Sequence, residues 1–202
     1  MKTTEPTTRD ALLHAARALF AERGYDGISV RDITAAADAN LGAITYHFGS
    51  KHALYEQVVA ACLEELTTRL QAVLASTADP LDRAEDVVRT YFDYFSENPE
   101  VPRLMLQELA RGFRPLPASV SSLRETHQAL TRLVREGQAQ GRIRAGVPEI
   151  MAMSIVSQPI HLMFVREMLR AFAVDPMAPG VRERVIANAT AFARAGLEER
   201  GP

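Results

Sequence analysis

The chain of 202 residues has one cysteine, no tryptophan and no long uninterrupted apolar run. The single cysteine, Cys62, excludes an internal disulfide and a zinc site built from several cysteines. No apolar run approaches the roughly 20 residues that a helix needs to cross a bilayer, and the first residues lack the apolar core of a secretion signal. We therefore expect no membrane partner and a cytoplasmic location.

The signatures of common catalytic and cofactor sites are also missing. None of the five histidines follows a glutamate by three residues, so the Glu-x-x-His pairs of a di-iron helical bundle are absent. His47 and His52 are off the four-residue spacing that places two metal ligands on one helical face. No glycine-rich phosphate loop follows a strand pattern. We therefore predict no catalytic residues, no metal, no cofactor and no enzymatic activity.

Charge alone gives little indication of a nucleic-acid partner. The formal net charge is −2, and the basic and acidic side chains of residues 1–55 balance, whereas a basic domain is typical of DNA-binding proteins. Residues 39–55, however, contain no carboxylate and include Lys51, His47 and His52. A DNA backbone would meet a locally acid-free surface there.

What the sequence does contain is helical periodicity. Apolar residues recur every three or four positions, and capping residues, glycines and prolines separate the periodic segments. The most apolar segment is 150–172, which Pro159 should kink because proline removes a backbone donor. No segment has the period of a strand. We predict an all-α chain with helices over about 8–23, 30–37, 41–48, 50–75, 80–97, 101–109, 120–140, 150–172 and 181–197.

The segment 29–51 carries the strongest functional pattern. Ser29 and Asp32 can cap a short helix reciprocally, and Asp38-Ala39-Asn40 then favours a tight turn. A second short helix follows, and the pair has the form of a helix-turn-helix whose second helix can lie in a DNA major groove. Periodicity alone leaves an ordinary helical hairpin equally open.

Helical spacing assigns the two faces of that second helix. Leu41, Ile44 and Phe48 are spaced to be buried, and the remaining residues should point outward. Small and hydroxyl side chains at the outward positions can approach base edges, whereas an arginine that could read guanine with two hydrogen bonds is absent. The residues expected to be outward are Gly42, Ala43, Thr45, Tyr46 and His47.

Residues 40–51, Asn-Leu-Gly-Ala-Ile-Thr-Tyr-His-Phe-Gly-Ser-Lys, followed by Ala53-Leu54-Tyr55, closely resemble the recognition-helix signature of the TetR family of bacterial transcription regulators. The resemblance is strong over residues 8–56 and weaker beyond them. Leu41 departs from the pattern, because many members carry a polar or basic residue there. The resemblance implies a DNA-binding role for Ser29, Arg31, Asn40, Gly42, Ala43, Thr45, Tyr46, His47 and Lys51.

The same resemblance implies an architecture. We expect an N-terminal three-helix bundle with a helix-turn-helix over 1–50. A long connecting helix should follow, and then a helical ligand-binding and dimerisation domain, the two together over 51–202. An apolar helix such as 150–172 is either buried in its own domain or covered by a partner subunit. The partner is favoured, since helix-turn-helix proteins commonly dimerise to reach successive major grooves about 34–36 Å apart. In TetR-like proteins the last two helices form the dimer interface, here 150–172 and 181–197.

A mixture of aromatic, methionine and polar residues in the C-terminal part suits a pocket with an apolar wall and a few polar anchors. Core packing is the simpler explanation for any one of them. The candidate ligand-binding residues are Tyr91, Tyr94, Phe95, Met105, Phe113, His127, Gln158, His161 and Phe164.

The predicted function is that of a ligand-responsive repressor, which a small apolar effector releases from a palindromic double-stranded operator. The alternative is a helical small-molecule-binding or partner-docking protein without sequence-specific DNA binding. Salt-sensitive binding to one duplex sequence separates the two, because only a regulator shows it.

Overall fold

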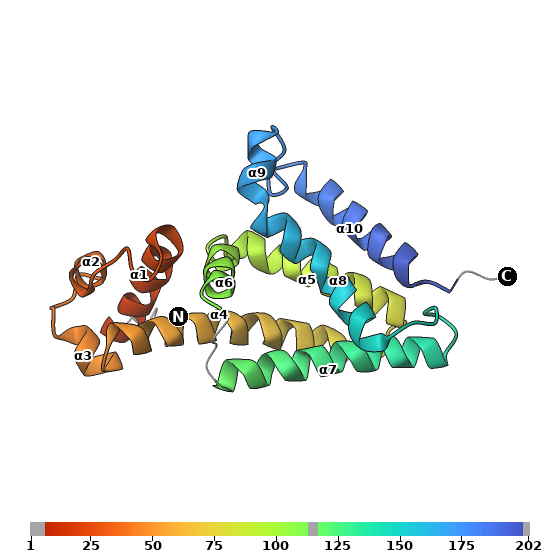
Figure 1. The fold of residues 1–202 in the computed structure, drawn as a ribbon, viewed down its shortest axis with the longest axis horizontal. Helices are drawn as coiled ribbons and strands as arrows, with labels where there is room; N and C mark the ends of the chain where they lie inside the picture. Colours follow the sequence, from red (N-terminus) through yellow and green to blue (C-terminus); the bar gives the residue numbers. More distant parts are fainter. Residues whose placement is uncertain (1–6, 113–116, 200–202) are drawn as a thin grey trace, which may run out of the picture. The chain divides into compact units, whose positions relative to one another are not determined.

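Residues 7–112 and 117–199 are described by the computed structural model, and over these residues the chain forms ten α-helices and no strand beyond one isolated bridge (Figure 1). The all-α prediction is therefore confirmed. The helices are α1 Thr8–Arg23, α2 Val30–Ala36, α3 Ala43–Phe48, α4 Lys51–Leu74, α5 Pro80–Glu97, α6 Val101–Ala110, α7 Pro117–Ala139, α8 Pro148–Phe164, α9 Arg166–Ala171 and α10 Arg182–Leu197.

The helices pack as two compact units that the chain enters more than once. Unit 1 consists of residues 1–63 and 100–119, and unit 2 of residues 64–99 and 120–202. The long helix α4 thus begins in unit 1 and ends in unit 2, and α6 belongs to unit 1 although it follows α5 in sequence. The predicted division at residue 50 cuts the chain once, whereas the packing divides it three times.

Unit 1 begins with helices whose starts are fixed locally. Asp10 N–H donates to Thr7 Oγ1 at 3.2 Å, and the Asp10 carboxylate in turn accepts from Thr7, so α1 opens with a capping box. Its inner face buries Leu12, Ala16 and Phe20. Helices α1, α2 and α3 all contact one another (red to orange in Figure 1), which gives the three-helix bundle expected for the N-terminal part.

Helix α6 completes unit 1 by packing on α1. The Gln107 side chain donates to the carbonyl oxygen of Ala21 at 3.3 Å, and Arg17 of α1 pairs with Glu100 just before α6. The Tyr55 hydroxyl of α4 donates to Glu108, and burial together with this carboxylate raises the pKa of Tyr55.

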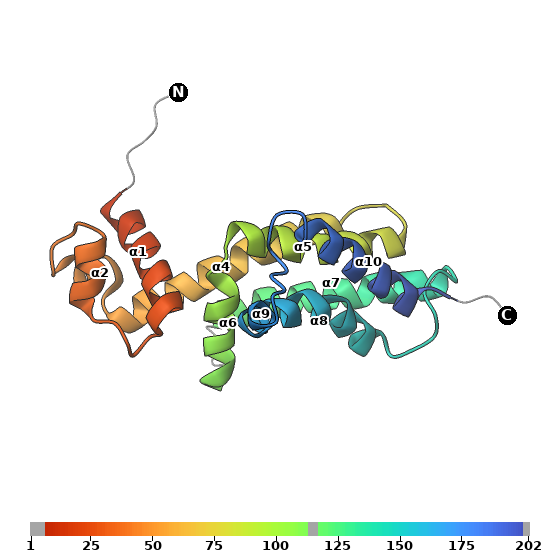
Figure 2. The same cartoon turned by 90° about the horizontal axis from the view of Figure 1, so that it is seen from above.

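Unit 2 is built around α5, which packs against α8 and α10 (Figures 1 and 2). Its apolar stripe is fully buried at Phe92, Tyr94 and Phe95. This helix begins at an Asp79 cap followed by Pro80, a residue suited to the first helical turn because its missing N–H would be unpaired there anyway.

The sequence predicted one helix over 150–172, kinked at Pro159, but the structure has two helices there, α8 and α9. Pro159 lies inside α8, which continues past it to Phe164, and the chain turns instead at Val165 before the short α9. Arg166 donates through Nε and Nη2 to the two carboxylate oxygens of Asp175 at 2.8 and 2.9 Å, and this pair closes the segment after the turn. Among the helices described, none is long and apolar enough to cross a membrane.

Candidate nucleic-acid interface

The two helices of the helix-turn-helix are held by their own caps and by a tight turn. Asp32 N–H donates to Ser29 Oγ at 3.2 Å, and the Ser29 N–H and hydroxyl donate to the Asp32 carboxylate at 2.7 and 2.6 Å. Hydrogen bonds from Ser29 lower the pKa of the Asp32 carboxyl, which keeps the cap ionised. Asp38 in the turn has φ +48°, a left-handed conformation that aspartate tolerates.

The recognition helix α3 presents a different face from the one that spacing predicted. Ile44 and Phe48 are buried as expected, but Ala43 is buried too, and Leu41 is 53% exposed. The physical reason is that α3 begins at Ala43, so residue 41 lies in the preceding turn and does not follow the helical period. The predicted outward position of Ala43 and the predicted burial of Leu41 were therefore wrong.

The remaining predicted DNA-binding residues lie mostly on the surface. The Tyr46 side chain is 85% exposed, and His47, half-buried, meets the Tyr46 ring edge-on at a centroid distance of 4.8 Å. Unit 1 has a hollow of about 690 Å³ between the start of α2 and the start of α3. Six residues line it: Ser29, Val30, Arg31, Leu41, Gly42 and Thr45. Asn40 is exposed beside it in the turn.

Lys51 has a structural role that sequence reasoning missed. Its ammonium donates to the carbonyl oxygen of Ile28 at 2.6 Å and lies 4.3 Å from the centroid of the Tyr25 ring. The guanidinium of Arg111 lies 4.6 Å from the same ring. Lys51 therefore ties the start of α4 to the residue before the α2 cap, and its remaining N–H groups are what it can offer to a phosphate.

Two stretches of the chain match known protein families. Residues 12–58 match the family described as bacterial regulatory proteins, tetR family, and residues 80–191 match the family described as the tetracyclin repressor-like C-terminal domain. The second match alone covers more than half of the chain. The chain belongs to the TetR family. The resemblance found in the recognition helix is thereby confirmed.

Individual relatives agree with this assignment. The chain is 29% identical over 139 residues to the transcriptional repressor KstR2 of Mycolicibacterium smegmatis, with 67% of each chain covered. It is 44% identical over 87 residues to the transcriptional repressor Rv3405c of Mycobacterium tuberculosis, which covers 40% of this chain and 44% of that one.

Two solved structures share the fold over nearly the whole chain. The TetR-family regulator PfmR of Thermus thermophilus has a TM-score of 0.75 at 25% identity and covers 93% of this chain and 98% of its own. The ketosteroid regulator KstR2 of Mycobacterium tuberculosis has a TM-score of 0.78 at 20% identity and covers 98% of both chains.

TetR-family membership confirms the predicted class of function. The protein is a DNA-binding transcriptional regulator with a helix-turn-helix, and the family consists of regulators and not of enzymes. TetR regulators bind operator DNA, dimerise and bind small-molecule effectors, which are the partners that the sequence predicted.

The described residues that were predicted to bind the effector lie on four helices, α5, α6, α7 and α8. Tyr91, Tyr94 and Phe95 are buried in the α5 core, and Met105 lies in α6, which belongs to unit 1. His161 is exposed, which conflicts with a place in a buried wall, and Phe164 is half-buried. Phe113 lies outside the described residues. Their assignment to an effector site therefore stays a prediction.

Two of the predicted polar anchors have buried atoms without a hydrogen bond. His127 Nδ1 on α7 and Gln158 Oε1 on α8 find no partner among the residues described. A buried polar atom left without a partner costs free energy, so both positions remain candidates for contact with a ligand. Gln158 also lines a cavity of about 250 Å³ between α8 and α10.

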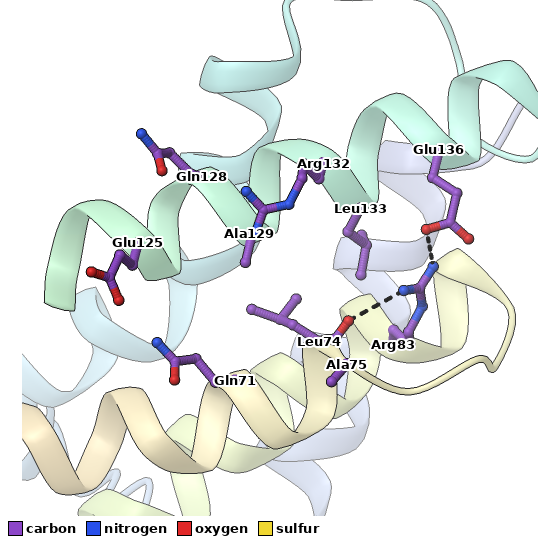
Figure 3. Close-up of a pocket in the computed structure, with 10 residues that line it drawn as sticks. All are labelled: Gln71, Leu74, Ala75, Arg83, Glu125, Gln128, Ala129, Arg132, Leu133 and Glu136. Carbon is purple, nitrogen blue, oxygen red and sulfur yellow. Dashed lines mark hydrogen bonds and ion pairs between the residues drawn. The ribbon is translucent and has the colours of Figure 1, made fainter.

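A larger cavity in unit 2, of about 520 Å³, lies between α4, α5 and α7 (Figure 3). Leu74, Ala129 and Leu133 form its apolar side, and Gln71 and Gln128 stand at its rim. None of the described residues that were predicted to bind the effector lines this cavity. The described residues that line it are Gln71, Leu74, Ala75, Arg83, Glu125, Gln128, Ala129, Arg132, Leu133 and Glu136.

Arg83 closes one end of the 520 Å³ cavity. Its side chain is buried, pairs through Nη2 with Glu136 at 2.6 Å and donates through Nη1 to the carbonyl oxygen of Leu74 at 3.4 Å. Its Nε has no partner among the residues described. The paired Arg83 lowers the pKa of the Glu136 carboxyl, so the cavity ends in an ion pair.

Proposed function

We propose that the protein is a cytoplasmic repressor that a small effector releases from a palindromic operator. The observation that carries the proposal is the surface of unit 1, where a family-matched recognition helix leaves Thr45 and Tyr46 exposed and no carboxylate between residues 39 and 55. Phosphate contacts would position this surface and base contacts would give it specificity. Two relatives, KstR2 and Rv3405c, are named as repressors, which supports repression and not activation.

The 520 Å³ cavity is the proposed effector site. Its volume lies in the range of about 300–1,000 Å³ typical of small-molecule sites. An apolar body would lie against Leu74 and Ala129, and one acceptor oxygen would bind beside the charged Arg83 in the lining. The expected effector is therefore a small compound with an apolar part and several polar groups, since six of the ten described lining residues are polar or charged.

Helix α4 connects this cavity to the DNA-binding residues. Its last turns carry Gln71 and Leu74, which line the cavity, and its first turn carries Lys51, which holds the start of α2. No glycine or proline interrupts the helix, so a tilt imposed at one end reaches the other end. An effector that fits one tilt better would change the spacing of two recognition helices and weaken the operator by linkage.

The dimer that this mechanism needs is proposed to form through α8 and α10. Both helices leave large apolar side chains exposed in the single chain, among them Ile150, Met153 and Phe192. Exposed apolar side chains on neighbouring helices are typical of a surface that another subunit covers.

The experiment has two stages. Selection from a random duplex pool should first yield a palindromic operator, and failure to enrich any sequence would refute the proposed function. The effector is then titrated with and without saturating operator. The effector lowers the affinity of the protein for the operator by some factor, typically about 5–150-fold. Linkage requires that bound operator lower the affinity for the effector by the same factor. Equal affinity in both titrations would refute the switch.

A matched pair of variants tests the cavity itself. Ala129→Phe fills the cavity and should abolish the response to the effector while operator binding persists. Ala139→Phe makes the same change at an exposed position of α7 outside the cavity lining and should leave the response intact. A normal response from Ala129→Phe would move the effector site elsewhere, with His127 and Gln158 as the next candidates.

A further inference from the structure

We propose that Leu41 is a specificity-determining residue that contacts the 5-methyl group of a thymine in each operator half-site. The inference rests on operator binding by this family and goes beyond it by naming the residue and the base. It starts from the observation that, at the recognition helix, the methyl group of Ala43 is buried and the side chain of Leu41 is exposed.

An exposed leucine by itself is ordinary on a protein surface, so the argument depends on where this one lies. Leu41 lines the 690 Å³ hollow of unit 1 together with Val30 and Thr45. Ile44 and Phe48 already fill the inner face of α3, so the core does not need Leu41. Its side chain is held outward, at the surface that faces DNA in this class of motif.

The chemistry around Leu41 favours one base. The hollow combines the apolar groups of Val30 and Leu41 with the methyl group of Thr45. Thymine is the base that presents a methyl group in the major groove, whereas the other base edges present hydrogen-bonding atoms there. A polar edge pressed against Leu41 would lose its water without gaining a partner. Arg31 lines the same hollow and can bind the adjacent phosphate.

Gly42 allows the DNA to come close enough for this contact. Within the protein, a Cβ added at Gly42 would meet only the Asn40 side-chain oxygen, at 3.5 Å, an ordinary contact distance. The fold therefore tolerates Gly42→Ala, and at the exposed Gly42 the surface is backbone without a side chain. If the Gly42→Ala variant binds the operator more weakly but keeps the wild-type unfolding temperature, the lost affinity shows that DNA approaches the backbone closely at this residue.

The test removes the methyl group from the DNA and the side chain from the protein. Each thymine of the selected operator is replaced in turn by deoxyuridine, which lacks only the 5-methyl group, and binding is measured with the wild type and with Leu41→Ala. At one position per half-site, the wild type should lose about three- to fivefold in affinity, the worth of one buried methyl group. The Leu41→Ala variant should bind the operator equally well with thymine and with deoxyuridine at that position.

Controls make the outcome unambiguous. Leu41→Ala should keep the wild-type unfolding temperature, because the side chain is exposed, and should bind random duplex as the wild type does. If deoxyuridine has the same effect on both proteins at every thymine, the contact does not exist and the proposal is overturned. If Leu41→Ala weakens operator and random DNA equally, Leu41 touches only the backbone, which also overturns it. Both results leave the regulator function standing, since the operator was selected beforehand.

Discussion

Replacement of Lys51 by alanine should destabilise the fold as well as weaken DNA binding. The variant loses a hydrogen bond from a charged donor to the Ile28 carbonyl, worth about 1.5–3 kcal/mol, and a cation–π interaction with Tyr25, worth about 0.5–1 kcal/mol. The sum is about 2–4 kcal/mol of unfolding free energy. For a chain of this length, that lowers the unfolding temperature by about 4–16 °C.

Two assays separate the structural role of Lys51 from its role on DNA. Thermal unfolding without DNA measures the first. The slope of log affinity against log salt measures the second, and it should decrease by about one unit for each phosphate that the variant no longer binds. His52→Ala is the matched control, because His52 is exposed, its contact with Glu56 at 3.5 Å is a surface contact of little worth, and it meets the Tyr25 ring only edge-on at a centroid distance of 5.9 Å. An unfolding temperature of Lys51→Ala equal to that of the control would refute the structural role.

Three further predictions concern stability and assembly. Gly27→Ala should cost at least about 2 kcal/mol in a denaturant titration, since its Cβ would lie 2.2 Å from the Arg23 carbonyl oxygen; an unchanged midpoint would contradict it. Phe192→Asp should convert the dimer to a monomer in analytical ultracentrifugation, since Phe192 is 68% exposed on α10; a persistent dimer would move the interface off this residue. Arg166 lowers the pKa of Asp175 from 3.8 to about 2. The folded-state value lies below the unfolded one, so the pair stabilises the fold above about pH 4, and about 1–2 kcal/mol should be lost as the pH falls to about 2. Asp175→Asn should flatten this part of the acid titration of unfolding free energy, and an unaltered profile would contradict the assignment.

Features that depend on neighbouring residues were predictable from the sequence. The Ser29 and Asp32 cap forms as expected, because both partners lie within one helical turn. The long helix predicted over 50–75 is observed as Lys51–Leu74, since its apolar period persists over many turns and small errors in phase average out.

Features that depend on phase in a short element, or on distant residues, were not predictable. A six-residue helix has fewer than two turns, so a start at Ala43 instead of Leu41 reassigns the face of both residues. The Ile28 carbonyl as the partner of Lys51 is a tertiary contact with no local signal. The sequence likewise has no signal for the end of α8 at Phe164 and the turn at Val165, since its one helix-breaking residue in this segment is Pro159.

The membership of α6 in unit 1 has a consequence for anyone who builds hybrid regulators from this protein. A splice placed after residue 58, where the N-terminal family match ends, would transfer α1–α3 without α6. The grafted part would then lack the partner of the Tyr55 hydroxyl, Glu108, and the donor to the Ala21 carbonyl, Gln107. A chimera that keeps the DNA-binding unit 1 intact must therefore also receive residues 100–112, as a second, separate insert.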